Sequence, residues 1–449
     1  MKNRFHIKTF GCQMNTYDSV RMAELLNGTG IYESVDDPAH ADLIIFNTCH
    51  IREKAEDKLF SELGRMRKSL KGRDVRFAVG GCVAQAEGYQ IFRRAPFVDL
   101  VFGPQNYHRL PRLLQRLEAG ESRICDDAEH AESKFEALPD TRTGGPIASV
   151  AVQEGCDKFC AFCVVPFTRG REWSRPVDEI LAEVTELARG GTREIHLLGQ
   201  NVNAYKAMDG DGVDHDLALL IRQVALIDGI DRIRFVTSHP VDMNEDLVEV
   251  FGDVPELCAY LHLPIQSGSN RVLDGMERGH DVDAYRHWVK RLRETSPDIA
   301  LASDFIVGFP GEDEAAFEET LAFVEEIGFD HAYSFKYSSR PGTPAAEMEH
   351  AVEESVKTER LARLQAVLNR HQEMKNKAQV GKIESVLVEG VSRRHSGEIM
   401  GRTSGMRTVN FAGSESLIGK IVSVQLTEGR ANSLRGCLID EECDRLDAE

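Results

Sequence analysis

The sequence has few cysteines, no long apolar run and no excess of positive charge. Ten cysteines among 449 residues are far below the density of secreted disulfide scaffolds, which excludes a small disulfide-stapled module. No segment approaches the roughly 18 to 20 apolar residues that cross a bilayer, and the first residues, MKNRFHIKTF, lack the apolar core of a signal peptide. We therefore expect a cytoplasmic protein without a membrane partner, in which clustered cysteines stay reduced and more often hold metal.

The charge balance is acidic. Fifty-four Lys and Arg against 73 Asp and Glu give a net charge of −19, which argues against a protein that coats nucleic acid without selectivity, although a local basic surface can still bind an anion. Hydrophobic residues make up 42% of the chain, enough for sizeable cores. At about 150 residues per domain, the length predicts about three domains.

Residues 1–117 alternate short apolar runs with helical patterns. The runs are RFHIKTF, DLIIFNT, VRFAVGG and VDLVFG, and the segments between them, such as 19–26 and 53–70, have apolar residues at three- and four-residue spacing. This alternation predicts a doubly wound α/β domain with a parallel sheet. Residues 118–145 are acidic and poor in large aliphatic side chains, and they run into a Gly-Gly-Pro sequence. They are therefore interpreted as a linker.

A second alternating region covers residues 146–375. It contains six strand candidates, most of them separated by long helical patterns, and six βα units in roughly 200 residues favour a partial (β/α)6 barrel over a full eight-stranded one. Its last segment, about 353–377, is interpreted as one long helix. Residues 376–439 hold short β-type runs broken by glycines, which predict a small antiparallel β-barrel.

The sharpest local signal is the motif Cys156-Asp-Lys-Phe-Cys160-Ala-Phe-Cys163, directly after the first strand candidate of the central region. Three clustered thiols fit structural zinc poorly, because that ion normally takes four ligands. A four-iron cluster held by three thiolates keeps one iron open for a small molecule. The alternatives are three unrelated buried thiols or a zinc site completed from elsewhere in the chain.

A second constellation is dispersed along the first region. Cys12, Cys49 and Cys82 each follow a predicted strand, at intervals of 37 and 33 residues, which is about the length of a βαβ unit. The carboxyl ends of parallel strands line one edge of a sheet, where open α/β sheets bind ligands. The pattern therefore predicts that the three thiols converge, with a chance placement of cysteines in turns as the alternative.

The motif at 156–163, with Phe162 before its last cysteine, resembles the cluster loop of the radical S-adenosylmethionine enzymes. Nine phrases in chain order are similar to the methylthiotransferases of that superfamily: TFGCQMN, NTCHIREKA, GGCVAQ, EGCDKFCAFCVVPFTRGRE, LLGQNVNAY, TSHP, LHLPIQSGS, SDFIVGFPGE and RPGTPAA. These phrases lie in the first and central regions, and together with the C-terminal barrel discussed below the resemblance covers nearly the whole chain.

The resemblance implies two four-iron ([4Fe-4S]) clusters. One, held by Cys156, Cys160 and Cys163, binds S-adenosylmethionine on its open iron, and an auxiliary cluster, held by Cys12, Cys49 and Cys82, carries the sulfur to be transferred. Two S-adenosylmethionine molecules are implied per turnover, one methylating that sulfur and one giving the 5′-deoxyadenosyl radical that attacks carbon-2 of an adenine.

The implied substrate is N6-isopentenyladenosine beside the anticodon in tRNA. The phrases QMN after Cys12 and IRE at 51–53 resemble the branch of the family with this substrate. The alternatives are the same chemistry on threonylcarbamoyladenosine tRNA or on an aspartate of a ribosomal protein, and a non-catalytic iron-sulfur carrier or redox sensor that binds RNA. An electron donor such as flavodoxin or ferredoxin and a sulfur donor are further expected partners.

Other positions carry weaker signals. Gln200 and Asn201 end the second strand candidate of the central region, where they are expected, with Phe162, to contact S-adenosylmethionine, although a polar turn explains them equally well. Arg169 and Arg171 follow the cluster loop and are interpreted as solvated loop arginines, with a carboxylate or RNA phosphate as the alternative partner. His239 is interpreted as a hydrogen-bonded core histidine.

The C-terminal region differs in charge from the rest of the chain. Residues 376–436 contain nine Lys and Arg against five Glu, a net of +4, so the remainder totals −23. A basic β-barrel on an acidic body is typical of a phosphate-binding appendage, and it resembles the small RNA-binding barrel of the methylthiotransferases. The alternative is an ordinary stabilising domain.

Overall fold

The computed structural model describes residues 2–50, 55–128, 134–135, 144–210, 212–392 and 397–439. The chain divides into two compact units. The first contains residues up to 143 together with 154–157 and 164–172, and the second contains the rest. None of the helices in these described ranges combines the length and the apolar character that crossing a membrane requires.

The first unit is built on a six-stranded parallel sheet with the order β2-β1-β3-β4-β5-β6. Its strands are β1 (Asn3–Phe10), β2 (Tyr32–Ser34), β3 (Leu43–Thr48), β4 (Arg76–Gly81), β5 (Leu100–Phe102) and β6 (Ile124–Asp126). The chain goes outward from β1 to β2 and then returns past β1 to β3. The strand order therefore reverses between β1 and β3, and such a switch point is where open α/β sheets bind ligands.

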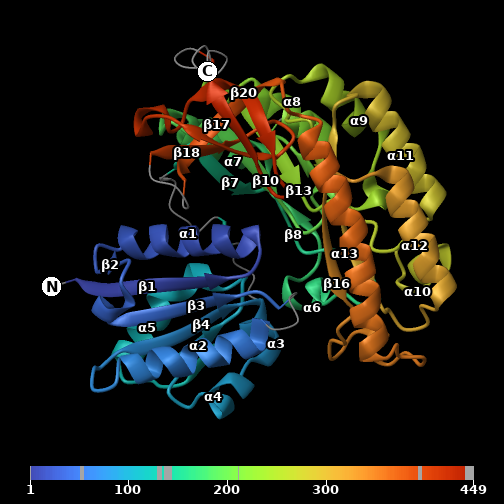
Figure 1. Ribbon diagram of the computed structural model, residues 1–449. Helices are drawn as coiled ribbons and strands as arrows, with labels where there is room; N and C mark the ends of the chain where they lie inside the picture. The colour runs from blue at the N-terminus through green and yellow to red at the C-terminus, as the bar shows by residue number, and fades with distance from the viewer. Residues whose placement is uncertain are drawn as a thin grey trace. The chain divides into compact units, whose positions relative to one another are not determined.

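Helices cover this sheet on two faces, with α1 (Gln13–Gly28) on one side and α2 (Ala55–Ser69) on the other (Figure 1). The remaining α-helices of the unit are α3 (Cys82–Glu87), α4 (Gln90–Arg94), α5 (Leu110–Glu118) and α6 (Val165–Thr168). Leu59 and Leu63 of α2 pack on Phe46, Phe77 and Val79 of the strands. Every residue of β3 is buried, as expected for a parallel strand covered on both faces.

The interpretation of residues 118–145 as a linker is wrong at its start. β6 lies within that segment and pairs in parallel with β5, with Ile124 opposite Leu100. Ile124 is buried, so this short strand closes one edge of the sheet. Three residues beside an acidic run give too little periodicity to be recognised. Most of the remaining segment, 129–133 and 136–143, lies outside the described residues.

The central region of the second unit contains six parallel strands in two sheets, β13-β10-β7 and β14-β15-β16. These strands are β7 (Ile147–Ala151), β10 (Glu194–Leu198), β13 (Arg232–Val236), β14 (Tyr260–His262), β15 (Ala300–Val307) and β16 (His331–Lys336). Each of the six strand candidates forms a strand. A parallel bridge from Ile233 to Leu257, just before β14, joins β13 to the chain that enters the second sheet.

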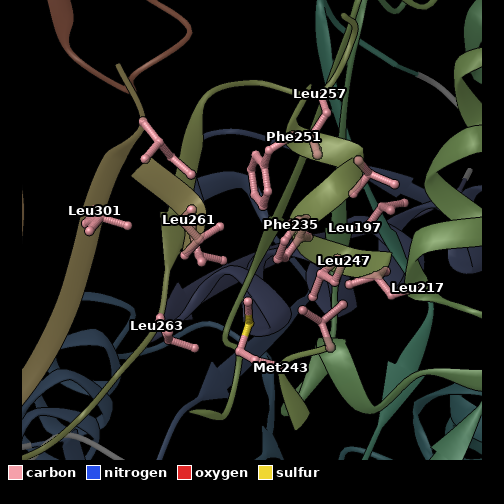
Figure 2. Packing of buried hydrophobic residues seen from close by; sticks show 14 of the residues in the cluster. Leu197, Leu217, Phe235, Met243, Leu247, Phe251, Leu257, Leu261, Leu263 and Leu301 are labelled. Carbon is pink, nitrogen blue, oxygen red and sulfur yellow. The ribbon is translucent and has the colours of Figure 1, made fainter. Parts of the chain in front are cut away.

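Alternate side chains of these strands face the surrounding helices. Figure 2 shows Leu197 of β10 and Phe235 of β13 beside Leu217 of α8 (Leu217–Ala225) and Leu247 of α9 (Glu245–Asp253), in one apolar core. The other helices of this region are α7 (Val177–Arg189), α10 (Asn270–Gly275), α11 (Val282–Thr295), α12 (Glu314–Ile327) and α13 (Glu354–Lys377). The intervening residues of these strands point to the other face, which we call the inner face. Many of them are polar, including Glu194, His196, Arg232, Arg234 and Tyr260.

The C-terminal region is a closed five-stranded barrel with the order β17-β18-β19-β21-β20. Its strands are β17 (Ile383–Val391), β18 (Glu398–Arg402), β19 (Thr408–Ala412), β20 (Ile421–Gly429) and β21 (Leu434–Leu438). The predicted barrel is confirmed, but it is not wholly antiparallel, because β19 and β21 pair in parallel. β20 pairs with β17, and β21 then lies between β20 and β19, so the parallel pair of β19 and β21 closes the barrel.

Two buried arginines join this barrel to the central strands. Arg232 donates to the carbonyl oxygens of Arg402 and Ser385 at 2.7 and 2.6 Å. Arg234 donates to those of Ser404 and Thr403 at 2.6 and 2.7 Å. These arginines begin β13, so the turn at 402–407 lies against the amino-terminal ends of the central strands, away from their carboxyl ends, where βα folds place their active sites.

Candidate functional site

The structure brings Cys12, Cys49 and Cys82 together at the switch point of the first sheet. Cys12 follows β1, Cys49 follows β3 and Cys82 follows β4. The register pairs Phe10 with Thr48 and Thr48 with Gly81, so the three strand ends are level. A hydrogen bond joins the Cys12 and Cys49 side chains, and the charge of Cys12 acts on Cys82. The predicted convergence of these thiols is therefore present.

Two glycines make the close approach of these turns feasible. Gly11 has φ +135°, and a Cβ added there would lie 2.3 Å from the Cβ of Cys49. Gly81 has φ +90°, and its Cβ would lie 2.5 Å from Thr48 O. Only glycine combines these backbone angles with such contacts. Packing around the thiols therefore requires glycine at the positions directly before Cys12 and Cys82.

A buried amide network holds the same turns in place. Asn47 Nδ2 donates to Asn15 O at 2.8 Å and to Ser19 Oγ at 2.9 Å, and Asn15 Nδ2 donates to Asn47 Oδ1 at 3.1 Å. As a thiol, Cys12 donates to Asn15 Oδ1 over 3.2 Å. The start of α1 is thereby tied to the end of β3, which positions Cys12 next to Cys49.

Arg169 lies beside these thiols and is 4% exposed. It donates to Asp18 Oδ2 at 2.7 Å, to Glu154 Oε1 at 3.4 Å, and to the side chain of Cys82. Lys134 forms an ion pair with Glu154, so two cations balance two carboxylates in this group. The interpretation of Arg169 as a solvated loop arginine is therefore wrong. It does hold for Arg171, whose side chain is 81% exposed beside Asp157.

The surroundings set the thiol pKa values in opposite directions. The hydrogen bond from Cys49, against the opposing effect of burial and with help from the charge of Arg169, lowers the pKa of Cys12 to about 6. Burial raises the pKa of Cys82, and Arg169 opposes that effect. The thiolate is the form that binds metal, so the site contains one thiol that ionises near neutral pH and a buried cation that favours ionisation of another.

The CxxxCxxC loop contributes to both units. Cys156 belongs to the first unit, where its amide donates to Gly170 O at 3.3 Å. Cys160 and Cys163 belong to the second, where a turn joins Cys163 N to Cys160 O at 2.9 Å. Phe159 has φ +49°, an unusual conformation for an aromatic residue and one associated with functional sites.

One residue that sequence reasoning did not place at the site, Arg278, contacts Cys160. Arg278 Nη1 donates to Cys160 Sγ at 3.4 Å, and Arg278 Nη2 donates to Pro264 O at 2.6 Å. Lys158, inside the loop, donates to Asp242 Oδ1 at 2.7 Å. Arg278 lies far from the motif in the sequence, within RGH at 278–280, and no pattern in the sequence pointed to it.

His239 also reaches the loop. Its Nε2 lies 3.9 Å from Cys160 Sγ, while its Nδ1 accepts from Val241 N at 3.2 Å. Nδ1 is thus the acceptor and Nε2 carries the proton, directed at the sulfur. Burial, followed by the charge of Arg278, lowers the pKa of His239 to about 2. It is a hydrogen-bonded buried histidine, as expected, and it stays neutral.

Gln200 and Asn201 lie at the carboxyl end of β10. Their backbone amides both donate to Gln153 Oε1, at 2.9 and 3.0 Å. The side chain of Asn201 donates to Asp242 Oδ2 at 2.8 Å, and its buried Oδ1 has no hydrogen-bond partner among the described residues. Phe162 packs against an apolar group that includes Met276. The polar end of β10 thus offers an unused acceptor to a ligand.

Both cysteine trios consist of thiol sulfur donors alone. Within the described ranges, no group of three or more His, Cys, Asp or Glu side chains is close enough to ligate one metal ion. In a four-iron cluster each thiolate binds a different iron, so its ligands stand further apart than those of one ion. The Cys12, Cys49 and Cys82 set contains only sulfur donors, which suits iron in such a cluster.

The C-terminal barrel offers less free positive charge than its composition indicates. Arg402, Arg407, Arg430 and Arg435 form ion pairs with Glu389, Asp330, Glu428 and Glu398, respectively. Arg393 and Arg394 lie outside the described residues. Much of the counted charge is therefore compensated within the second unit.

Three family profiles match the chain in the order of its regions. Residues 4–103 match the uncharacterized protein family UPF0004, residues 150–324 match the Radical SAM superfamily, and residues 377–439 match the TRAM domain. The central strands and the CxxxCxxC loop therefore belong to a radical S-adenosylmethionine protein.

Relatives narrow this class. A tRNA-2-methylthio-N(6)-dimethylallyladenosine synthase from Magnetococcus marinus is 64% identical over 97% of this chain and 99% of its own length. The protein of the same name from Methylococcus capsulatus is 52% identical over 98% of this chain and 96% of its own length. The chain belongs to the family of tRNA-2-methylthio-N(6)-dimethylallyladenosine synthases.

Solved structures share the fold at low identity. The radical S-adenosylmethionine methyltransferase TsrM from Kitasatospora setae superposes with a TM-score of 0.58 at 14% identity, over 77% of each chain. The cobalamin-dependent radical enzyme OxsB gives a TM-score of 0.54 at 13% identity, over 82% of this chain and 56% of that one. The α/β architecture of this chain is therefore that of radical S-adenosylmethionine enzymes.

Proposed function

We propose that this protein adds a methylthio group to carbon-2 of N6-dimethylallyladenosine, also called isopentenyladenosine, beside the anticodon in tRNA. The observation that carries the proposal is 64% identity, over 97% of the chain, to an enzyme named for this product. The Radical SAM and TRAM matches supply a radical-forming region and an RNA-binding region in one chain.

We assign the radical-forming cluster to Cys156, Cys160 and Cys163 and an auxiliary cluster to Cys12, Cys49 and Cys82. When bound, two four-iron clusters and two S-adenosylmethionine molecules would supply the radical chemistry that removes the unactivated hydrogen from carbon-2, and the methyl group and sulfur that take its place. The convergence of the second trio at the switch point of the sheet supports its assignment.

The protein's own residues position and shield these groups. Arg278 and the Nε2–H of His239 donate to Cys160, and such donors orient a ligating sulfur and tune the metal behind it. Arg169 places a positive charge next to Cys82 in the other trio. Asn201, with its free acceptor, and Gln200 are assigned to the polar part of S-adenosylmethionine, and Phe162 to its apolar part.

The proposed domain layout follows from this assignment. Residues 1–117, extended by β6, form the auxiliary-cluster domain, residues 146–375 form a partial (β/α)6 barrel, and residues 376–439 bind RNA. The reaction also needs an electron donor, such as flavodoxin or ferredoxin, and a sulfur donor. The protein is placed in the cytoplasm because both cysteine trios are free thiols, as reducing conditions favour, although Cys437 is disulfide-bonded.

Mass spectrometry of tRNA nucleosides from a strain without the protein tests the proposal. We expect 2-methylthio-N6-dimethylallyladenosine to be absent and the unthiolated nucleoside to accumulate, with rescue by the wild-type chain but not by a Cys12→Ala variant. Unchanged levels of the product, or loss of methylthio-threonylcarbamoyladenosine in its place, would contradict it. Iron analysis tests the cluster assignment, with about eight irons per chain expected from two four-iron clusters.

A further inference from the structure

A polar cavity lies between the central strands and the C-terminal barrel. It has a volume of about 200 Å³ and is lined by residues that include Tyr260, His331, Tyr333, Arg402, Arg407 and Asn432. This volume is below the roughly 300–1,000 Å³ of a typical small-molecule site, so the cavity suits one flat ring. It adjoins the amino-terminal ends of β14 and β16, whereas the cysteine loop and the end of β10 form the site described above.

Tyr333 supplies an exposed aromatic face to this cavity. It lies on β16, the edge strand of its sheet, and is 61% exposed. Its register partner is Asp304, and two positions earlier His331 lies opposite Ala302. Because side chains alternate along a strand, Tyr333 and His331 project from the same side of the sheet. Base stacking is a common use of an exposed aromatic ring in RNA-binding proteins.

The part of the cavity wall formed by Tyr260, His331 and Arg407 is held rigidly. Tyr260 and His331 pack with ring centroids 6.1 Å apart, and His331 Nε2 lies 3.3 Å from Gly405 O. Arg407 pairs with Asp330. A cavity with a fixed back wall and one open aromatic face binds without reorganising, which reduces the entropic cost of binding.

Two arginines give the cavity a preference for an anionic, acceptor-rich ligand. The side chain of Arg402 is 30% exposed and 3.3 Å from Glu389, so its charge is shared with solvent. The buried Nε of Arg407 has no hydrogen-bond partner among the described residues. A buried donor without an acceptor costs free energy, and an acceptor from a ligand would remove that cost.

We infer that this cavity binds one unpaired nucleotide of the substrate RNA, with its base stacked on Tyr333 and its phosphate next to Arg402. The inference rests on the proposed function for its choice of ligand, since the TRAM-matched region forms one wall of the cavity. Most of the barrel's arginines are paired with acidic side chains, so the barrel has little unpaired positive charge to attract RNA. Stacking in this cavity therefore supplies part of the affinity for RNA. The cavity is a second RNA contact, distinct from the cysteine-lined site.

The test measures binding of a fluorescein-labelled anticodon stem-loop RNA to the full-length, cluster-loaded protein, without S-adenosylmethionine or reductant. We expect Tyr333→Ala to weaken binding on the order of tenfold, as for loss of one stacked base, and Tyr333→Phe to bind as the wild type does. The matched control is Tyr89→Ala, because Tyr89 is 63% exposed in the first unit and should have no effect. Arg402→Gln should reduce the salt dependence of binding by about one phosphate contact.

A series of RNAs, each with one abasic loop position, identifies the nucleotide. One position should weaken binding to the wild type and leave binding to Tyr333→Ala unchanged. Equal affinity of Tyr333→Ala and the wild type for the intact RNA would overturn the inference, as would binding of free AMP in the cavity without effect on RNA affinity. Failure of the proposed function is a separate result, because it would appear as absence of the methylthio product with wild-type protein.

Discussion

At the scale of single residues, buried charged side chains surround Cys12, Cys49 and Cys82. Arg169 is a buried cation next to Cys82. Asp18 and Glu154 form ion pairs with it, and Lys134 pairs with Glu154. A buried charge without its partner is expensive, so these four residues depend on one another. The thiols therefore sit in a group that is already neutral overall before any of them ionises.

Replacing Arg169 tests this dependence. We expect Arg169→Gln to lower the free energy of unfolding by about 3–5 kcal/mol, because Asp18 loses its closest counter-ion in a buried site. Arg171→Gln, two residues away and exposed, should change it by less than about 1 kcal/mol. Urea denaturation of the cluster-free protein measures both, and equal effects of the two variants would contradict the assignment of Arg169 to the buried group.

The pKa of Cys12 predicts a pH dependence in the cluster-free protein. Its folded-state pKa is lowered to about 6 from an ordinary value of 9.0. The unfolded chain therefore binds more protons between these values, and stability rises with pH across this window. The contribution of Cys12 is complete above the ordinary pKa and disappears as pH falls through about 6. In Cys12→Ser this slope should be reduced.

Alkylation rates provide the direct measurement. Peptide mass spectrometry after brief iodoacetamide treatment should give half-maximal labelling of Cys12 near pH 6, since the thiolate is the nucleophile. Cys82, whose pKa is raised by burial, should label slowly up to alkaline pH. Labelling of Cys12 that begins only near pH 9 would contradict the prediction.

At the scale of elements, the same arrangement of a strand, a glycine turn and a cysteine occurs at the ends of β1 and β4. It positions two of the three thiols. We expect Gly11→Ala to destabilise the protein and to reduce iron bound after reconstitution, because its Cβ would overlap that of Cys49. Gly120 also has a positive φ, +95°, but has no atom within 4 Å of an added Cβ. Gly120→Ala therefore measures backbone strain alone, and the excess loss in Gly11→Ala reports crowding at the thiols.

The apolar runs allowed the main strands and the convergence of the thiols to be predicted, because strand ends in a parallel sheet share an edge. β2 and β6 were not predicted, since their short sequences, YES and ICD, lack the continuous apolar run that marks β5. The burial of Arg169 and the contact of Arg278 with Cys160 were also beyond prediction. Whether an arginine is solvated or buried depends on which distant carboxylates the fold brings to it, and no local pattern encodes that.

At the scale of the whole molecule, the C-terminal barrel is part of the second unit and not a loosely attached appendage. Arg234 Nε donates to Glu194 Oε1 at 2.8 Å while its other nitrogens bind the barrel. Burial raises the pKa of Glu194, but the hydrogen bond from His196 and the charge of Arg234 lower it to about 2. The ion pair and the barrel thus stabilise each other.

Removing Arg234 should weaken this attachment. We expect Arg234→Met to cost about 3–5 kcal/mol, because a buried carboxylate loses its partner, and to expose the segment after α13 to limited proteolysis. Arg222→Gln, which removes an exposed pair with Asp253 at 3.3 Å, should cost less than about 1 kcal/mol. Thermal unfolding and digestion patterns check both, and a protease-resistant Arg234→Met would show that the barrel is held by other contacts.

Because Arg232 and Arg234 recognise main-chain oxygens of the turn at 402–407, they constrain the path of that turn and leave its side chains free to vary. Substitutions that preserve the course of the chain should be tolerated there, whereas a single inserted or deleted residue would shift every acceptor at once. Exchange of this barrel for that of a relative should therefore succeed or fail according to the length of one short turn, however different the two barrels are elsewhere.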